Sequence, residues 1–225
     1  MINIDRNGVK FKIASVCDEG LSWWDNYNNW EVETFAVFDK YLRSDMVYFD
    51  LGTYTGQTVL YASQKVKSVY GVELDYRAYG ACKKNIEVNA ISNVNGYVNC
   101  VGKMGGSSRR ISNNEGSETI SMTIEALMDK WNVDTCDFIK IDIEGGEEIV
   151  LPSMNSFFSK HTPIVWISVH RHYGATANTV VNSLGKIYNT VYDSFGNKII
   201  GDINLRNAIN SGPSGFGNDY LFINE

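Results

Sequence analysis

The stretch YFDLGTYTG, residues 48–56, is the part of the chain that decides the fold. The apolar run before the first glycine, residues 46–51, is typical of a buried strand, and residues 57–66 have the pattern of a helix. Glycine has no Cβ and tolerates positive φ, so a turn that contains Gly52 and Gly56 lets the backbone approach another group closely. The stretch therefore predicts a strand, a tight turn that is a candidate ligand loop, and a helix.

The same alternation of strand and helix patterns continues along the chain. Further strands are predicted at residues 68–74, 94–101, 137–143 and 163–170, and further helices at residues 76–90 and 123–131. The segments YNTVYDS and GNDYLFIN near the end of the sequence are also strand-like. This alternation indicates βαβ units and an α/β fold with a doubly wound, mostly parallel sheet, in which ligands bind beyond the carboxyl ends of the strands.

The domain organisation is read from the absence of any linker-like stretch in the 225 residues. We expect one domain at residues 31–225, preceded by an N-terminal addition at residues 1–30 that packs on or near the cofactor site. The aromatic segment LSWWDNYNNW, residues 21–30, could cover that site or stack on a sugar, but packing against the sheet is the more common use of such side chains.

Charge and cysteine content narrow the class of partner. Lys and Arg number 20 against 26 Asp and Glu, a net charge of −6, and no basic run exceeds Arg109-Arg110, so no nucleic-acid partner is expected. The four cysteines lack C-x-x-C spacing, which predicts reduced thiols and a cytoplasmic protein. No apolar run reaches about 18 residues, so no membrane span is expected. The sequence leaves the oligomeric state open.

Glu73 lies at the end of the second predicted strand, about 20 residues beyond the glycine turn, where an acidic side chain can accept hydrogen bonds from ribose hydroxyls. The turn itself reads D-x-G-x-x-x-G rather than G-x-G-x-x-G, with Tyr54 where a dinucleotide motif has glycine. Together these features favour a nucleoside-containing cofactor, and S-adenosylmethionine over NAD. A structural turn and a surface glutamate are the alternative interpretation.

The segment DFIKIDIEGGEEIVL, residues 137–151, is the most specific motif in the sequence. Lys140, Asp142 and Glu144 are spaced by two, which predicts that all three lie on one strand face near its end. Burying three charges is costly unless they pair or serve a ligand. The alternative is an internal ion pair of Lys140 that only orders the loop.

These segments, together with GVELD, KKNIEVNAISNV, SMTIEALMDKWNV and VWISVH, give the chain a resemblance to FkbM-type methyltransferases over about residues 30–170. The resemblance implies a class I, Rossmann-like fold with an antiparallel terminal strand, and S-adenosylmethionine as cofactor. It also implies an O-methyltransferase acting on a hydroxyl, first of all that of a carbohydrate or glycan. A nicotinamide-dependent Rossmann oxidoreductase and a non-catalytic cofactor-binding module are the alternatives.

The resemblance also implies roles for single residues. Around the methionine half of the cofactor it places Asp50, Gly52, Thr53 and Gly56. It places Glu73 on the ribose, Leu74 beside adenine and Asp142 beside the transferring methyl. Thr53-Tyr54 stand where the family often has Ala-Asn, and Leu74 where it often has Pro. Substrate choice is expected in residues 102–118 and after residue 170.

His170 ends the strand at residues 163–170, so its side chain should reach the same sheet edge as Asp142 and Glu144. An imidazole with a reference pKa of about 6.5 can take a hydroxyl proton at neutral pH. We therefore expect His170 to be the general base, with Asp142 and Glu144 orienting it or the acceptor. Two alternatives stay open: these three residues bind Mg²⁺ or Mn²⁺, or His170 is structural.

Overall fold

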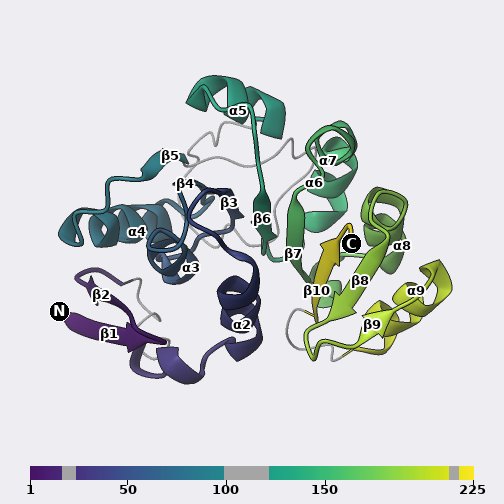
Figure 1. The fold of residues 1–225 in the computed structure, drawn as a ribbon, viewed down its shortest axis with the longest axis horizontal. Coiled ribbons are helices and arrows are strands. Elements are labelled where there is room, and N and C mark those ends of the chain that lie inside the picture. Colours follow the sequence, from purple (N-terminus) through teal and green to yellow (C-terminus); the bar gives the residue numbers. More distant parts are fainter. Residues whose placement is uncertain (17–23, 99–121, 213–217) are drawn as a thin grey trace. The chain divides into compact units, whose positions relative to one another are not determined.

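The computed structural model describes residues 1–16, 24–98, 122–212 and 218–225 (Figure 1). By its internal contacts the chain divides into two compact units, Met1–Cys100 and Val101–Glu225. Part of the aromatic segment, the expected substrate loop at residues 102–118, Cys17 and Cys100 lie outside the described residues. Among the residues that are described, no helix combines the length and the apolar character needed to cross a bilayer.

The first unit contains an N-terminal hairpin and three parallel strands in the order β5-β4-β3. Its strands are β1 (Ile2–Arg6), β2 (Val9–Ile13), β3 (Val47–Leu51), β4 (Ser68–Val72) and β5 (Val94–Val98). Its helices are η1 (Tyr27–Asn29), α2 (Val32–Tyr41), α3 (Gln57–Ala62) and α4 (Tyr76–Val88). Every residue of β3 and β4 is buried, which is the burial expected for strands covered on both faces.

Helices α3 and α4 follow β3 and β4 as the sequence predicts. Helix α3 is wholly buried and ends four residues before the predicted residue 66. The carboxylate of Asp75 caps α4 by accepting the backbone N–H groups of the second and third residues of the helix. The buried side of α4 contains Ala78, Ala81 and Cys82, and also Asn85, a polar residue that is fully buried.

The N-terminal hairpin packs against the first unit's helices. Phe11 of β2 meets Trp24 and Tyr27 edge-on, at ring distances of 6.2 and 5.6 Å. Trp24 and Tyr27 are each only 1% exposed, and Tyr27 donates its hydroxyl to the carbonyl of Gln57 at 2.7 Å. The described part of the aromatic segment therefore contributes to a core. Whether residues 1–30 affect the cofactor site stays a prediction.

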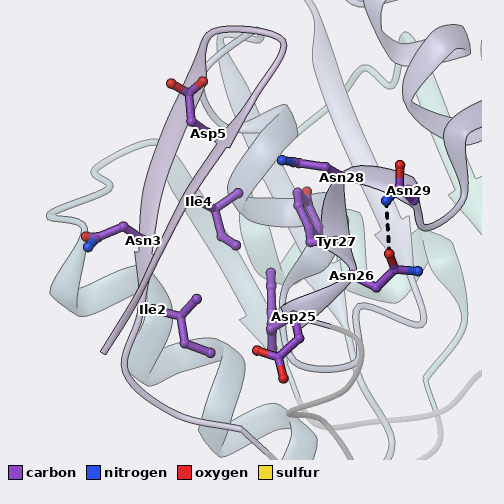
Figure 2. Close-up of a pocket in the computed structure, with 10 residues that line it drawn as sticks. Ile2, Asn3, Ile4, Asp5, Asp25, Asn26, Tyr27, Asn28 and Asn29 are labelled. Carbon is purple, nitrogen blue, oxygen red and sulfur yellow. Dashed lines mark hydrogen bonds between the residues drawn. The ribbon is translucent and has the colours of Figure 1, made fainter.

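Two cavities lie away from the predicted site residues. One, of about 320 Å³, lies between β1 and the segment that begins at Trp24 (Figure 2). It is lined by polar side chains that include Asn26 and Asn29, which are hydrogen-bonded to each other at 3.0 Å. The other, of about 160 Å³, lies between two helices of the second unit and includes His161. The described residues that line these two cavities all differ from those predicted to bind the cofactor or to act in catalysis.

The second unit orders its strands β6-β7-β10-β8-β9, and the pair β6 and β7 is parallel. These strands are β6 (Phe138–Ile141), β7 (Ile164–Val169), β8 (Thr190–Asp193), β9 (Lys198–Ile199) and β10 (Asn218–Ile223). The helices are α5 (Ile124–Trp131), α6 (Glu147–Ser153), α7 (Asn155–His161), η2 (Arg171–Tyr173), α8 (Ala177–Val180), η3 (Val181–Gly185) and α9 (Asp202–Ser211). Strand β10 runs antiparallel to β7 and β8, which confirms the predicted antiparallel terminal strand.

Candidate active site

The glycine turn joins β3 to α3 in the first unit. Both glycines have positive φ, 90° at Gly52 and 104° at Gly56, so the turn needs them for its conformation. Three backbone N–H groups of the turn are hydrogen-bonded within the first unit. Thr53 donates to the carbonyl of Val72, Tyr54 to the carboxylate of Glu73, and Gly56 to the carbonyl of Thr53. Hydrogen bonds within the unit therefore hold the turn.

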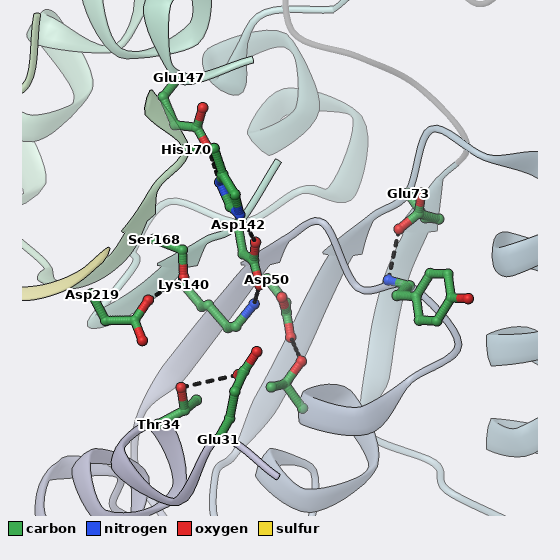
Figure 3. Close-up of polar contacts among 12 residues, drawn as sticks. Glu31, Thr34, Asp50, Glu73, Lys140, Asp142, Glu147, Ser168, His170 and Asp219 are labelled. Atoms are coloured by element: carbon green, nitrogen blue, oxygen red, sulfur yellow. Dashed lines mark hydrogen bonds and ion pairs between the residues drawn. The ribbon is translucent and has the colours of Figure 1, made fainter. Parts of the chain in front are cut away.

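Glu73 is fixed at the carboxyl end of β4 by two backbone groups (Figure 3). Its Oε2 accepts the N–H of Tyr54 at 2.6 Å, and its Oε1 accepts the N–H of Asp75 at 2.8 Å. The side chain is buried, and this burial raises the pKa of Glu73 to about 7 despite those hydrogen bonds. A carboxylate oxygen can accept more than one hydrogen bond. The half-buried Leu74 follows directly.

Asp50 and Thr53 lie at the end of β3 and in the turn after it. Asp50 is fully buried, and its Oδ2 accepts the hydroxyls of Tyr48 at 2.8 Å and Thr58 at 2.6 Å, which ties β3 to α3. The hydroxyl of Thr53 is hydrogen-bonded to that of Tyr97 at 2.8 Å. The sequence analysis did not identify Tyr97 as a neighbour of Thr53, because its place there depends on the pairing of β4 with β5.

In the second unit, four side chains form a continuous line of ionic contacts, which we call the charged row: Lys140, Asp142, His170 and Glu147 (Figure 3). Lys140 Nζ lies 2.9 Å from Asp142 Oδ2, and Asp142 Oδ1 lies 3.4 Å from His170 Nε2. His170 Nδ1 lies 2.8 Å from Glu147 Oε1. The row lies at the carboxyl ends of β6 and β7, where an α/β fold binds ligands.

The charged row is buried, and its members set one another's ionisation. The side chains of Lys140 and Glu147 are 2% and 1% exposed. Burial alone would raise the pKa of Asp142, but the charges of Lys140 and His170 lower it below its usual value. Burial likewise opposes protonation of His170, but the hydrogen bond to Glu147 and the charges of Asp142 and Glu147 raise the pKa of His170 above 6.5.

The structure confirms part of the predicted grouping and corrects the rest. Asp142 does lie beside both Lys140 and His170. Glu144, however, lies three residues beyond the end of β6 at Ile141, so the predicted side-chain alternation does not carry through to it. Glu144 is exposed in the following turn, with a left-handed φ of 46°. The carboxylate hydrogen-bonded to His170 belongs instead to Glu147, a member of the quoted motif to which the sequence analysis gave no role.

The proposed metal set, Asp142, Glu144 and His170, does not fit a divalent cation. Both ring nitrogens of His170 are directed at carboxylates, and the ammonium of Lys140 already supplies positive charge to Asp142. His170 Nδ1 is hydrogen-bonded to Glu147, and Glu144 lies in the exposed turn after β6, so these three residues are not assembled as one ligand set. In the part of the chain that the structure describes, no group of three or more His, Cys, Asp and Glu side chains is arranged to hold a metal.

Asp219 of β10 adds a further carboxyl group near the charged row. It pairs in register with Ser168 of β7, whose hydroxyl donates to Asp219 Oδ1. Burial raises the pKa of Asp219 to about 6, and the charge of Asp142 adds to this effect. The sequence analysis did not identify Asp219, because the residues that pair across β7 and β10 are about fifty positions apart.

The two units together have the fold of a class I, Rossmann-like methyltransferase that uses S-adenosylmethionine. Solved structures of this fold include the Synechocystis magnesium protoporphyrin IX methyltransferase with bound S-adenosylmethionine, at 14% identity and a TM-score of 0.51, covering 94% of this chain and 86% of that one. Another is M. capricolum TrmK with S-adenosylhomocysteine, at 15% identity and a TM-score of 0.50, covering 85% and 67%. At such identities the likeness shows the fold alone.

The family follows from the sequence match. The model of the methyltransferase FkbM domain matches residues 50–193, and the chain belongs to this family. An uncharacterized protein of Methanocaldococcus jannaschii, MJ1452, is 38% identical over 68 residues, which are 28% of this chain and 26% of that protein. The match thus spans about a quarter of that relative's length.

Proposed function

We propose that the protein is an O-methyltransferase that moves a methyl group from S-adenosylmethionine to a hydroxyl of a carbohydrate or glycan. The observation that supports it is the hydrogen bond of 2.8 Å between His170 Nδ1 and Glu147, with Nε2 of the same ring facing Asp142. An alcohol acceptor must lose a proton, and an imidazole held in this way is suited to take it. Family membership supports methyl transfer, and the resemblance of the sequence motifs points to a sugar alcohol.

The first unit would hold the cofactor. Glu73 would accept the ribose hydroxyls, because its two oxygens lie at the carboxyl end of β4 and are already oriented by backbone N–H groups. The glycine turn would let the backbone approach the methionine half, with Asp50, Gly52, Thr53 and Gly56 around it and Leu74 beside adenine. When bound, S-adenosylmethionine supplies an electrophilic methyl group on a positively charged sulfur.

The second unit would supply the proton acceptor. An alcohol acceptor must give up its hydroxyl proton as it is methylated, and Nε2 of His170 would receive that proton. Asp142, which stays ionised beside Lys140, would orient the acceptor and then stabilise the imidazolium. Positioning of the reacting groups supplies much of the acceleration in such a transfer.

The cellular setting is part of the proposal. The two described cysteines, Cys82 and Cys136, are buried free thiols, which suits a cytoplasmic protein. The net charge of −6 supports a neutral glycan or a small molecule as the acceptor rather than a nucleic acid.

The test is transfer of labelled methyl groups to a panel of glycans and small alcohols, with S-adenosylhomocysteine affinity measured in parallel. We expect turnover with a sugar alcohol, a loss of at least about 10²-fold in His170→Ala with cofactor affinity retained, and no loss with EDTA. Full transfer by His170→Ala would rule out His170 as the base. Loss with EDTA that Mn²⁺ restores would support the metal alternative.

The remaining alternatives are separated by ligand binding. Thermal stabilisation by NADH but not by S-adenosylmethionine would support an oxidoreductase. Tight S-adenosylhomocysteine binding without transfer to any acceptor in the panel would support a non-catalytic binding module.

A further inference from the structure

We infer that Glu147 is a positioning residue: it holds the Nδ1–H of His170, so that Nε2 is the nitrogen presented to the acceptor hydroxyl. The inference deepens the proposed function and rests on it for the identity of the reaction. The hydrogen bond itself is a property of the second unit and can be tested without any substrate.

Glu147 is held more firmly than an ordinary helix glutamate. It is the first residue of α6, and its side chain is 1% exposed. Both oxygens are used, Oε1 at 2.8 Å from His170 Nδ1 and Oε2 at 2.7 Å from the backbone N–H of Gly145. A buried carboxylate is costly unless such partners stabilise it. The burial of Glu147 therefore favours a role in holding the His170 ring over that of a surface glutamate that faces water.

The segments that follow β6 and β7 are held together on both sides of this contact. On one side, Gly145 lies so close to Tyr173 that a Cβ on the glycine would come within 2.8 Å of the tyrosine carbonyl oxygen. On the other side, Glu148 accepts the backbone N–H of Thr176 at 2.9 Å and the hydroxyl of Thr179 at 2.7 Å. The motif E-G-G-E-E thus joins the two segments, with Glu147 in the middle of the junction.

The geometry distinguishes the two ring nitrogens of His170. In a neutral imidazole one nitrogen donates and the other accepts. Nδ1 makes the short, buried contact to Glu147, whereas Nε2 is 3.4 Å from Asp142, beyond the usual range of a hydrogen bond. Nδ1 therefore keeps its hydrogen, and Nε2 holds the lone pair that receives the acceptor proton. The positive charge of the protonated ring then lies between the carboxylates of Asp142 and Glu147.

Several charged or titratable groups face His170 from the surrounding elements. They are Glu147 on α6, Lys140, Asp142 and Glu144 on β6 and the turn after it, Asp219 on β10 and His172 on η2. Of these, Glu147 is the one within 3 Å of a His170 ring nitrogen in the described structure.

The first experiment is nitrogen NMR of the histidine side chains during a pH titration. The chain has three histidines, so His170→Gln assigns the His170 signals directly. We expect the Nδ1–H tautomer in the wild type, a lower His170 pKa in Glu147→Gln because the carboxylate charge is lost, and no change of pKa in Glu148→Gln. Glu148→Gln is the matched control, because it disturbs the same helix turn and junction without touching His170. A wild-type ring in the Nε2–H form would overturn the inference even if Glu147→Gln failed to fold.

The second experiment is the pH profile of turnover for the same variants. Glu147→Gln should lower kcat by about 10²-fold with KM nearly unchanged, and should move the rising limb to lower pH, whereas Glu148→Gln should leave the limb in place. A folded Glu147→Gln protein with normal kcat would overturn the positioning role. Absence of any methyl transfer would instead contradict the proposed function, and the NMR result would still decide the contact between Glu147 and His170.

Discussion

Glu73 accepts the backbone N–H of Tyr54 at 2.6 Å, so the end of β4 is hydrogen-bonded to the turn that follows β3. The turn places Tyr54 at a left-handed φ of 47°, a conformation that non-glycine residues adopt at a cost. The carboxylate therefore both supports the turn and remains the candidate ribose acceptor. This double use makes Glu73 the most informative position in the first unit.

Glu73→Ala should weaken S-adenosylhomocysteine binding by about 1–3 kcal/mol, because it removes charged hydrogen bonds and leaves the Tyr54 N–H unsatisfied. Calorimetry on protein with a native circular dichroism spectrum is the measurement. Glu87→Ala, at an exposed position on α4, is the control and should bind normally. Equal affinity for both variants would remove Glu73 from the ribose site.

Cofactor binding should depend on pH through the same carboxyl group. Burial raises the pKa of Glu73 from 4.5 to about 7, so the folded protein prefers the protonated carboxyl. This preference adds to the free energy of unfolding of the apoprotein below pH 4.5, and the contribution is lost as the pH rises through about 7. Ribose hydroxyls donate to the ionised form, so affinity should rise as pH increases through about 7, with proton release on binding. Calorimetry in buffers of different ionisation enthalpy measures that release, and Glu73→Gln should abolish it. A flat pH profile in the wild type would contradict this assignment.

Gly145→Ala should destabilise the second unit strongly. Alanine at this position would have to keep a φ of 98°, and its Cβ would come within 2.8 Å of the Tyr173 carbonyl oxygen. Gly174→Ala is the matched control, because Gly174 has a φ of 107° but open space around it, so only the backbone cost of about 1–3 kcal/mol applies. Urea unfolding of both variants measures the difference. Equal losses would mean that the segments after β6 and β7 are not packed as described.

Asn85→Ala should destabilise the first unit by about 2 kcal/mol or more. The buried amide accepts the N–H groups of Ala14 and Ser15 and donates to the carbonyls of Ser15 and Thr55, so its loss leaves the buried carbonyl of Thr55 and part-buried groups of residues 14 and 15 unpaired. Asn89→Ala is the control, since its hydrogen bonds to Lys12 lie near the surface. The midpoint temperature of thermal unfolding should be much lower for Asn85→Ala than for Asn89→Ala.

Several elements could be predicted from the sequence because their causes are local. Thr123 caps α5 by accepting the N–H of Ala126, as its position before the helix predicts. The glycines at positions 52 and 56 adopt the positive φ that a tight turn after a strand requires. The mainly apolar runs at β3, β4, β6 and β7 became buried strands because both faces of a parallel sheet are covered by other elements.

The sequence by itself determined the α/β class and the family, because hydrophobic periodicity and motifs report these directly. Only the tertiary structure decided that Glu147, rather than Glu144, holds His170, and that Ser168 meets Asp219. The first pair is 23 positions apart and the second 51, and neither contact follows a period of helix or strand. Side-chain alternation ends where β6 ends, so beyond Ile141 the direction of each carboxylate depends on a turn, a helix start and strands brought together from distant parts of the chain.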